Sequence, residues 1–170
     1  MEFGKEYYKF FVDEMNKYVD GVNFLNQGIE NWYIEKMETK LKVKLPEEYR
    51  GFLRIYNGGE IFRPGTVLSE IYINPNDRVR GGYYLNDVFD EKYKITELPE
   101  NLLFIATMNY GDKICIDMSN SREIAKIMQW DIQTGEITRE WSSFKDWLSS
   151  CLEAGEMLVD YDGSEKEINF

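Results

Sequence analysis

The residue types that enzymes use for acid–base and nucleophilic chemistry are scarce in this chain. The 170 residues include no histidine and two cysteines, Cys115 and Cys151. Without histidine there is no Ser-His or Cys-His pair and no His-ligated metal, and two distant cysteines do not make a zinc site. We therefore expect two free thiols, and a protein that is not an enzyme.

Other motifs that could hold a ligand are also weak. There is no glycine-rich phosphate-binding motif, and we interpret Gly58-Gly59 as a helix stop and Gly81-Gly82 as a turn. The acidic run over residues 160–165 lacks the third oxygen ligand and the distant glutamate of a calcium loop, so it predicts a solvated turn. No spacing rule selects a carboxylate pair for glycoside hydrolysis. The sequence predicts no catalytic residue, no metal site and no cofactor.

The charge is more informative. With 31 acidic and 20 basic side chains the net charge is −11. Such a field repels nucleic acid and anionic membranes and attracts basic proteins, although acidity can also serve solubility alone. The basic residues over 36–50 interleave with acidic ones, which indicates a charge mosaic on helices and not a nucleic-acid surface. A protein is thus the expected partner.

One segment combines aromatic and acidic side chains in the manner of a protein interface. Aromatic residues supply binding energy at interfaces, and acidic ones steer a basic partner. The alternative is a strand in which one tyrosine points inward and the other outward. The candidate partner-binding residues are Tyr83, Tyr84, Asp87, Asp90 and Glu91.

The elements that must position these residues follow from the apolar spacing. Helices are expected over residues 4–19, 29–41 and from Pro46 to about Tyr56, with a loop over 20–28. In the third helix Tyr49, Phe52, Leu53 and Tyr56 form a stripe that should face the sheet. A short helix is possible over 86–92, and strands are expected over 60–63, 67–73, 83–85, 102–107, 113–118, 124–130 and 136–141. A hairpin turn falls at 131–135, and Ser143 with Asp146 begins a closing helix.

This order predicts the fold class. N-terminal helices, then hairpin-linked strands, then one helix indicate a single α+β domain over residues 1–170 with a mainly antiparallel sheet. No apolar run reaches the ~20 residues of a membrane span, and no signal peptide is evident. We expect a cytoplasmic protein; the sequence does not indicate its oligomeric state.

Three blocks in order resemble the SUKH superfamily of bacterial toxin-immunity proteins and their eukaryotic and viral cell-wall-regulator relatives. The first runs from Leu45-Pro46-Glu47-Glu48-Tyr49 to Asn57-Gly58-Gly59, preceded by Ile29, Glu38 and Leu41. The second is Leu98–Ala106 followed by Asn109–Asp117, and the third is Ser142–Leu148. Together they cover about residues 29–152, which leaves a helical extension at 1–28, an acidic tail at 153–170 and an insert at 60–97 that matches no family pattern.

The resemblance implies a non-catalytic immunity protein, an antitoxin that binds and neutralises a cognate toxin. The toxin would be a nuclease or another enzyme with a basic groove, within a polymorphic toxin system. The alternative is an intracellular scaffold or regulatory adaptor that binds an endogenous protein.

Overall fold

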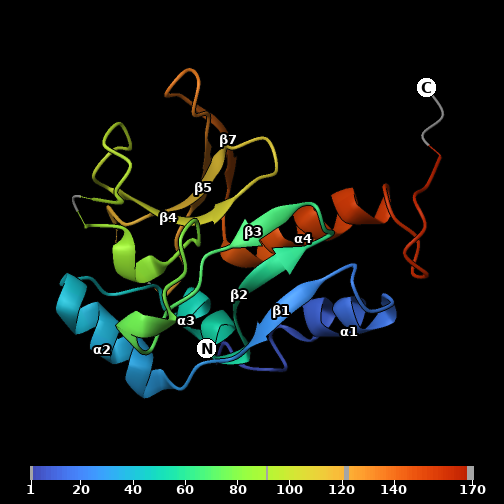
Figure 1. The fold of residues 1–170 in the computed structure, drawn as a ribbon, viewed down its shortest axis with the longest axis horizontal. Coiled ribbons are helices and arrows are strands. Elements are labelled where there is room, and N and C mark those ends of the chain that lie inside the picture. The colour runs from blue at the N-terminus through green and yellow to red at the C-terminus, as the bar shows by residue number, and fades with distance from the viewer. Residues whose placement is uncertain (1, 91, 121–122, 168–170) are drawn as a thin grey trace.

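In the computed structural model, which describes residues 2–90, 92–120 and 123–167, an antiparallel sheet carries helices on one face (Figure 1). The described helices are α1 (Lys9–Lys17), α2 (Asn31–Leu41), α3 (Glu47–Ile55) and α4 (Phe144–Glu156), with short 3-10 turns at Pro75–Asp77 and Leu85–Asp87. The described strands are β1 (Phe24–Gln27), β2 (Tyr56–Ile61), β3 (Thr66–Leu68), β4 (Leu102–Thr107), β5 (Lys113–Asp117), β6 (Ile127–Trp130) and β7 (Ile137–Trp141).

The sheet is a meander in which each strand pairs with its neighbour in the chain. Its order is β1-β2-β3-β4-β5-β6-β7, and every pair is antiparallel. The turn between β6 and β7 falls at the expected place, since the N–H of Asp131 donates to the carbonyl of Glu136 at 2.9 Å. The predicted α+β class, with N-terminal helices, an antiparallel sheet and a closing helix, is confirmed.

The two faces of the sheet have different neighbours, because side chains alternate along each strand. On β4 and β5 the buried Leu103, Ile105, Ile114 and Ile116 belong to the main core that the helices complete. Leu102, Phe104 and Cys115 belong to a second cluster that Ile95 and Leu98, from the segment before β4, help to cover. The second face is therefore covered by irregular chain and not by helices.

Aromatic rings connect α3 to the other helices. The ring centroid of Phe52 lies 5.5 Å from that of Tyr8, 5.7 Å from that of Phe11 and 4.9 Å from that of Phe144. Such edge-to-face contacts add to the stabilisation from buried area. Tyr49, Phe52 and Leu53 are buried, which confirms the expected stripe, while Tyr56 is half-buried and begins β2.

A buried carboxylate joins the start of α4 to the rest of the fold. Glu48 is 1% exposed, and its Oε1 accepts the backbone N–H of Phe144 at 2.8 Å. Its Oε2 accepts the hydroxyl of Tyr7 at 2.6 Å and lies 3.4 Å from the N–H of Lys145. The first N–H groups of a helix have no partner within it, so a carboxylate placed there satisfies them and complements the helix dipole. Ser143, as expected, caps the same helix by accepting the N–H of Asp146 at 3.1 Å.

A second buried ionic group lies between α2 and α3. The guanidinium of Arg50 is 3.2 Å from Glu38 and 2.9 Å from Glu47. Glu38 also accepts the backbone N–H of Leu45 at 2.7 Å, which fixes the chain that leads into α3. Burial is the main cause that raises the pKa of Glu38, while this N–H and Arg50 oppose the rise.

Two local predictions near the start of the sheet are wrong. Residues 24–27 form β1 inside the expected loop, and Gly58-Gly59 lie inside β2 instead of ending a helix. Both glycines have positive φ, and a Cβ on Gly59 would stand 2.2 Å from the carbonyl oxygen of Phe24. Gly59 therefore lets β1 approach β2 closely, while a Cβ on Gly58 would stand 2.8 Å from the carbonyl oxygens of Leu68 and Ser69 at the end of β3. Only glycine fills both positions without strain.

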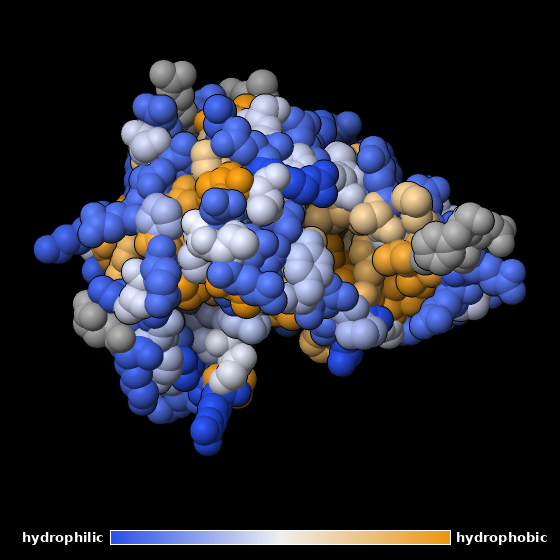
Figure 2. All heavy atoms as spheres, turned by 90° about the horizontal axis from the view of Figure 1, so that it is seen from above, coloured by the Kyte–Doolittle hydropathy of each residue, from blue (hydrophilic) through white to orange (hydrophobic). Residues whose placement is uncertain are grey.

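The acidic stretch after α4 folds back onto α1. Val159 and Glu165 form an isolated antiparallel bridge, and Asp162 accepts the N–H of Ser164 at 2.9 Å within the exposed turn. The hydroxyl of Tyr161 donates to Glu14 at 3.0 Å. Hydrophilic side chains cover most of the face seen from above, with hydrophobic ones showing between them (Figure 2).

Candidate functional site

The chain between β3 and β4 forms the outer wall of a hollow on the second face of the sheet. Two asparagine side chains hold this segment in place of strand partners. Asn57 donates to the carbonyl of Ile71 at 2.9 Å and accepts its N–H at 2.8 Å. Asn86 does the same for Tyr72, at 3.1 and 2.9 Å. The two side-chain amides thus pair the backbone N–H and carbonyl groups that a neighbouring strand would pair in a sheet. They fix the course of this segment although it forms no regular strand.

The two candidate tyrosines point to opposite sides of this wall. Tyr84 is 4% exposed, and its hydroxyl accepts the N–H of Val79 at 3.0 Å. Tyr83 is 36% exposed and packs edge-on against Phe104. The inward–outward arrangement that a strand would give is present, but the strand expected over 83–85 is not: Tyr84 makes only an isolated bridge with Glu70. Tyr83 is thus the tyrosine that a partner can reach.

The candidate acids also differ from one another. Asp87 is 7% exposed and accepts from the Nε of Arg78 at 2.7 Å, so its charge is already paired. Asp90 is exposed, and its Oδ1 accepts the N–H of Lys92 at 2.9 Å in a turn. Glu91 lies outside the described residues. The helix considered over 86–92 is reduced to the 3-10 turn Leu85–Asp87. The partner-binding role of these residues remains a prediction.

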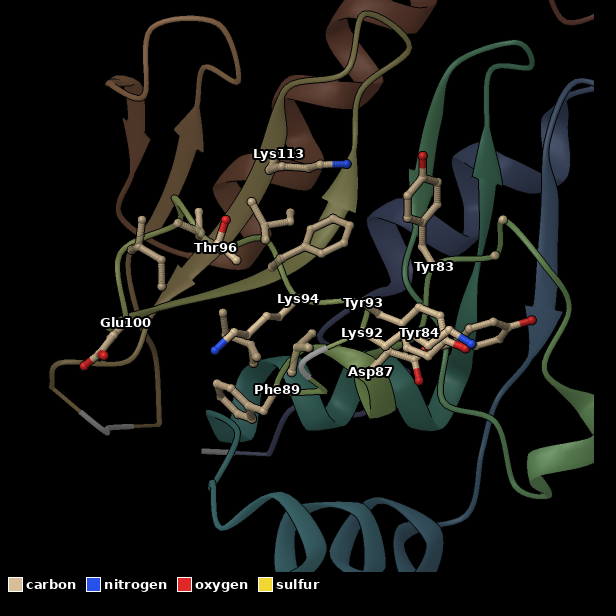
Figure 3. A pocket seen from close by; sticks show the side chains of 18 of the residues that line it. Tyr83, Tyr84, Asp87, Phe89, Lys92, Tyr93, Lys94, Thr96, Glu100 and Lys113 are labelled. Carbon is tan, nitrogen blue, oxygen red and sulfur yellow. The ribbon is translucent and has the colours of Figure 1, made fainter.

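The hollow beside them has a volume of about 1100 Å³. The sheet supplies Leu102, Leu103, Phe104 and Lys113, and residues 78–100 supply the rest of the lining. Tyr83 and Lys113 are in the upper part of the close-up, while Phe89 and Tyr93 lie below them (Figure 3). Phe89 and Tyr93 are 46% and 39% exposed. Aromatic walls with a few charged groups are typical of binding sites.

Cations line this hollow, and the sequence analysis missed them. The ammonium of Lys113 lies 4.8 Å from the ring centroid of Tyr83 and 4.7 Å from that of Phe104, and it donates to Thr107 at 3.1 Å. Burial lowers the pKa of Lys113, because the charged form loses hydration. Arg78 stands 3.6 Å from the ring centroid of Tyr93. The signal in the sequence was the alternation of basic and other residues at 78–80 and 92–94, which a chain-wide net charge conceals.

The thiols are not placed for nucleophilic chemistry. Both are free, with Cys115 buried on β5 and Cys151 half-buried on α4. Burial raises the pKa of each to about 12, so thiolate is rare at neutral pH. Within residues 2–90, 92–120 and 123–167, no three acidic or thiol side chains gather as a metal site would require. The arrangement of the hollow is suited to binding.

In the described residues, helices on one face of a seven-stranded antiparallel meander and an irregular insert on the other face define an α+β protein. The chain belongs to the SMI1 / KNR4 family (SUKH-1), whose model matches residues 28–150. This confirms the SUKH resemblance, which the sequence motifs placed at 29–152. A comparison with curated proteins gives no match.

Membership of this family is consistent with an immunity-type protein that binds a protein partner. The residues of its first sequence block have clear structural roles here: Glu48 binds the start of α4, and Asn57 holds Ile71. Among the described residues, no helix has both the length and the apolar character needed to cross a bilayer.

Proposed function

We propose that this protein is an immunity protein that binds a cognate toxin in the cytoplasm and blocks its active surface, without chemistry of its own. The observation that carries the proposal is the set of exposed aromatic side chains around the hollow: Tyr83, Phe89 and Tyr93. Exposed aromatic anchors of this kind dominate the binding energy of protein interfaces. They lie on the face that the helices leave open, in a chain of a family consistent with immunity.

The toxin that best fits the charge is an enzyme with a basic substrate groove, such as a nuclease. A net charge of −11 attracts such a partner over distances of about a Debye length. Association should therefore slow as salt rises from about 10 to 150 mM, since the Debye length falls from roughly 30 to 8 Å. Dissociation should change far less, because it depends on desolvated contacts at the centre of the interface.

Where a toxin gene lies immediately upstream, the direct test uses that toxin in two forms: inactivated by mutation in a binding assay, and active in a growth-protection assay. Tyr83→Ala combined with Phe89→Ala should weaken binding tenfold or more and abolish protection. Trp32→Ala is the matched control, because Trp32 is a 57% exposed aromatic residue that does not line the hollow. Equal losses from the control and the double variant would show that another face binds.

The second candidate is a scaffold or regulatory adaptor that uses the same face on an endogenous protein. The exposed aromatic surface supports this candidate equally well, and the sequence contains no feature that is specific to a toxin partner. Genomic setting separates the two. A large secreted-toxin gene immediately upstream supports immunity, whereas an isolated gene whose product captures a cellular protein supports the adaptor.

A further inference from the structure

The hollow has the opposite charge to the protein as a whole. Two of its described lining residues are acidic, Asp87 and Glu100, and the first of these is paired with Arg78. Five are basic: Arg78, Arg80, Lys92, Lys94 and Lys113. At physiological salt a charge is screened beyond about 8 Å, so a group inside the hollow experiences these cations more strongly than the acids on other parts of the surface.

Among the cations of the hollow, Lys113 has the least favourable surroundings for a positive charge. It extends from β5 on the second face of the sheet, where its ammonium is half-buried between two aromatic rings. Its hydrogen-bond acceptor there is the neutral hydroxyl of Thr107, and in the described part of the chain it has no ion-pair partner. A half-buried cation without a counter-charge is a site where an incoming carboxylate gains more than it would in water.

The arrangement of the cations indicates what kind of anion fits. Arg80 and Lys92 come from separate turns of the insert, and Lys113 comes from β5 of the sheet. Figure 3 shows Lys113 in the upper part of the hollow and Lys92 below it. Exposed Tyr83 and Phe89 line the same hollow. A hollow of about 1100 Å³ exceeds what one carboxylate or phosphate group fills. Spread cations with apolar surface between them match a peptide segment in which acidic and apolar side chains alternate.

We propose that the hollow binds an acidic segment of the partner protein, with one carboxylate at Lys113, a second at Arg80 or Lys92, and apolar side chains against Tyr83 and Phe89. This inference rests on the proposed function, because it assumes that the partner is a protein that docks on this face. The overall negative charge then steers the partner's basic surface, and the hollow selects the partner whose docking segment carries carboxylates. A partner without carboxylates leaves Lys113 desolvated and without a counter-charge, which is costly.

The first experiment measures fluorescence anisotropy of a labelled peptide that alternates Glu and Tyr, titrated with the full-length protein. The matched probes replace every Glu with Gln or with Lys, and ATP is added as a competing small anion. The Glu peptide should bind at least tenfold more tightly than the Gln peptide, and more weakly as salt increases. Equal binding of the Glu and Gln peptides, or no binding of the Glu peptide, overturns the inference. Tighter binding of ATP than of the Glu peptide also overturns it in favour of a small-molecule site.

The second experiment locates the binding. Arg80→Gln combined with Lys113→Gln should weaken the Glu peptide tenfold or more, since each substitution removes a charged hydrogen-bond donor. The control, Lys5→Gln with Lys40→Gln, changes the net charge equally at exposed lysines that do not line the hollow. Circular dichroism confirms that both proteins are folded. Equal weakening by the two double variants overturns the assignment to the hollow.

The inactivated toxin separates the two proposals. If it binds wild type and the Arg80/Lys113 variant equally but not the Tyr83/Phe89 variant, the acidic-segment inference fails and the immunity proposal stands. If it does not bind wild type, the immunity proposal itself fails.

Discussion

Replacing Glu48 with alanine should destabilise the protein by about 3–4 kcal/mol. The substitution takes the carboxylate acceptor from the N–H of Phe144, at 2.8 Å, and from the hydroxyl of Tyr7, at 2.6 Å. A hydrogen bond to a charged group contributes about 1.5–3 kcal/mol, and the interaction of the carboxylate with the start of α4 adds about 0.3–1 kcal/mol. Part of this is offset, because the variant no longer has to desolvate a buried charge.

Urea unfolding followed by circular dichroism measures this loss, provided that the dependence on urea keeps the same slope. Two milder variants test the reasoning. Tyr7→Phe removes one of the hydrogen bonds to the carboxylate and should cost about 1.5–3 kcal/mol, and Glu48→Gln keeps an oxygen for Phe144 and should cost about 1–2 kcal/mol. In the double variant Glu48→Ala with Tyr7→Phe the losses should not add, because the two residues share one bond. A loss below about 1 kcal/mol for Glu48→Ala would refute the account of α4 given above.

Phe52→Ala should cost about 3–5 kcal/mol in the same assay, since it empties the centre of the aromatic core; a loss below about 1 kcal/mol would show that the stripe of α3 is not core. Asn57→Ala should speed hydrogen exchange at the N–H of Ile71, which then lacks its 2.8 Å acceptor, and unchanged protection would contradict the role of this side chain. Because their pKa values are about 12, Cys115 and Cys151 in the folded protein should not react with a thiol-reactive disulfide reagent at pH 8. Both should react once the chain is unfolded in guanidinium, and labelling of the folded protein should rise as the pH approaches 12. Cys115→Ser and Cys151→Ser should each still protect cells when the variant is folded, and loss of protection by a folded variant would favour a catalytic mechanism.

The parts of the fold that could be read from the sequence are those governed by neighbours in the chain. Short apolar runs located β4 and β5, the turn at 131–135 located the last hairpin, and Ser143 marked the start of α4. Each signal needs only a few consecutive residues. The stripe of α3 was equally local, because its four residues lie within about two turns of helix.

The parts that were missed depend on contacts between distant residues. β1 has the sequence Phe-Leu-Asn-Gln and is partly exposed, so it shows no apolar–polar alternation, and its close approach to β2 depends on Gly59. The path of the insert depends on Asn57 and Asn86, whose amides act on residues 14 positions away. Such long-range hydrogen bonds leave no periodic pattern in the sequence.

The partner-binding role of the candidate residues is still a prediction, but their surroundings show what sequence could not reveal. Tyr83 stands out in the sequence as an aromatic residue, whereas the pairing of Asp87 with Arg78 is visible only in the folded chain. Lys113 is separated from the insert by β4, and only the folded sheet brings it to Tyr83.

The order of the strands has a consequence for how the molecule is made. Every pairing in the sheet joins strands that are consecutive in the chain, so each strand can find its partner as soon as it leaves the ribosome. The bond from Glu48 to Phe144 spans 96 residues and forms only after the last strand has been synthesised. A nascent chain that stops before residue 144 can therefore assemble its sheet while Glu48 still lacks the helix start that it binds. If the protein protects its own cell, that protection begins with the translation of α4, and the delay before protection includes the time needed to synthesise the chain as far as Glu156.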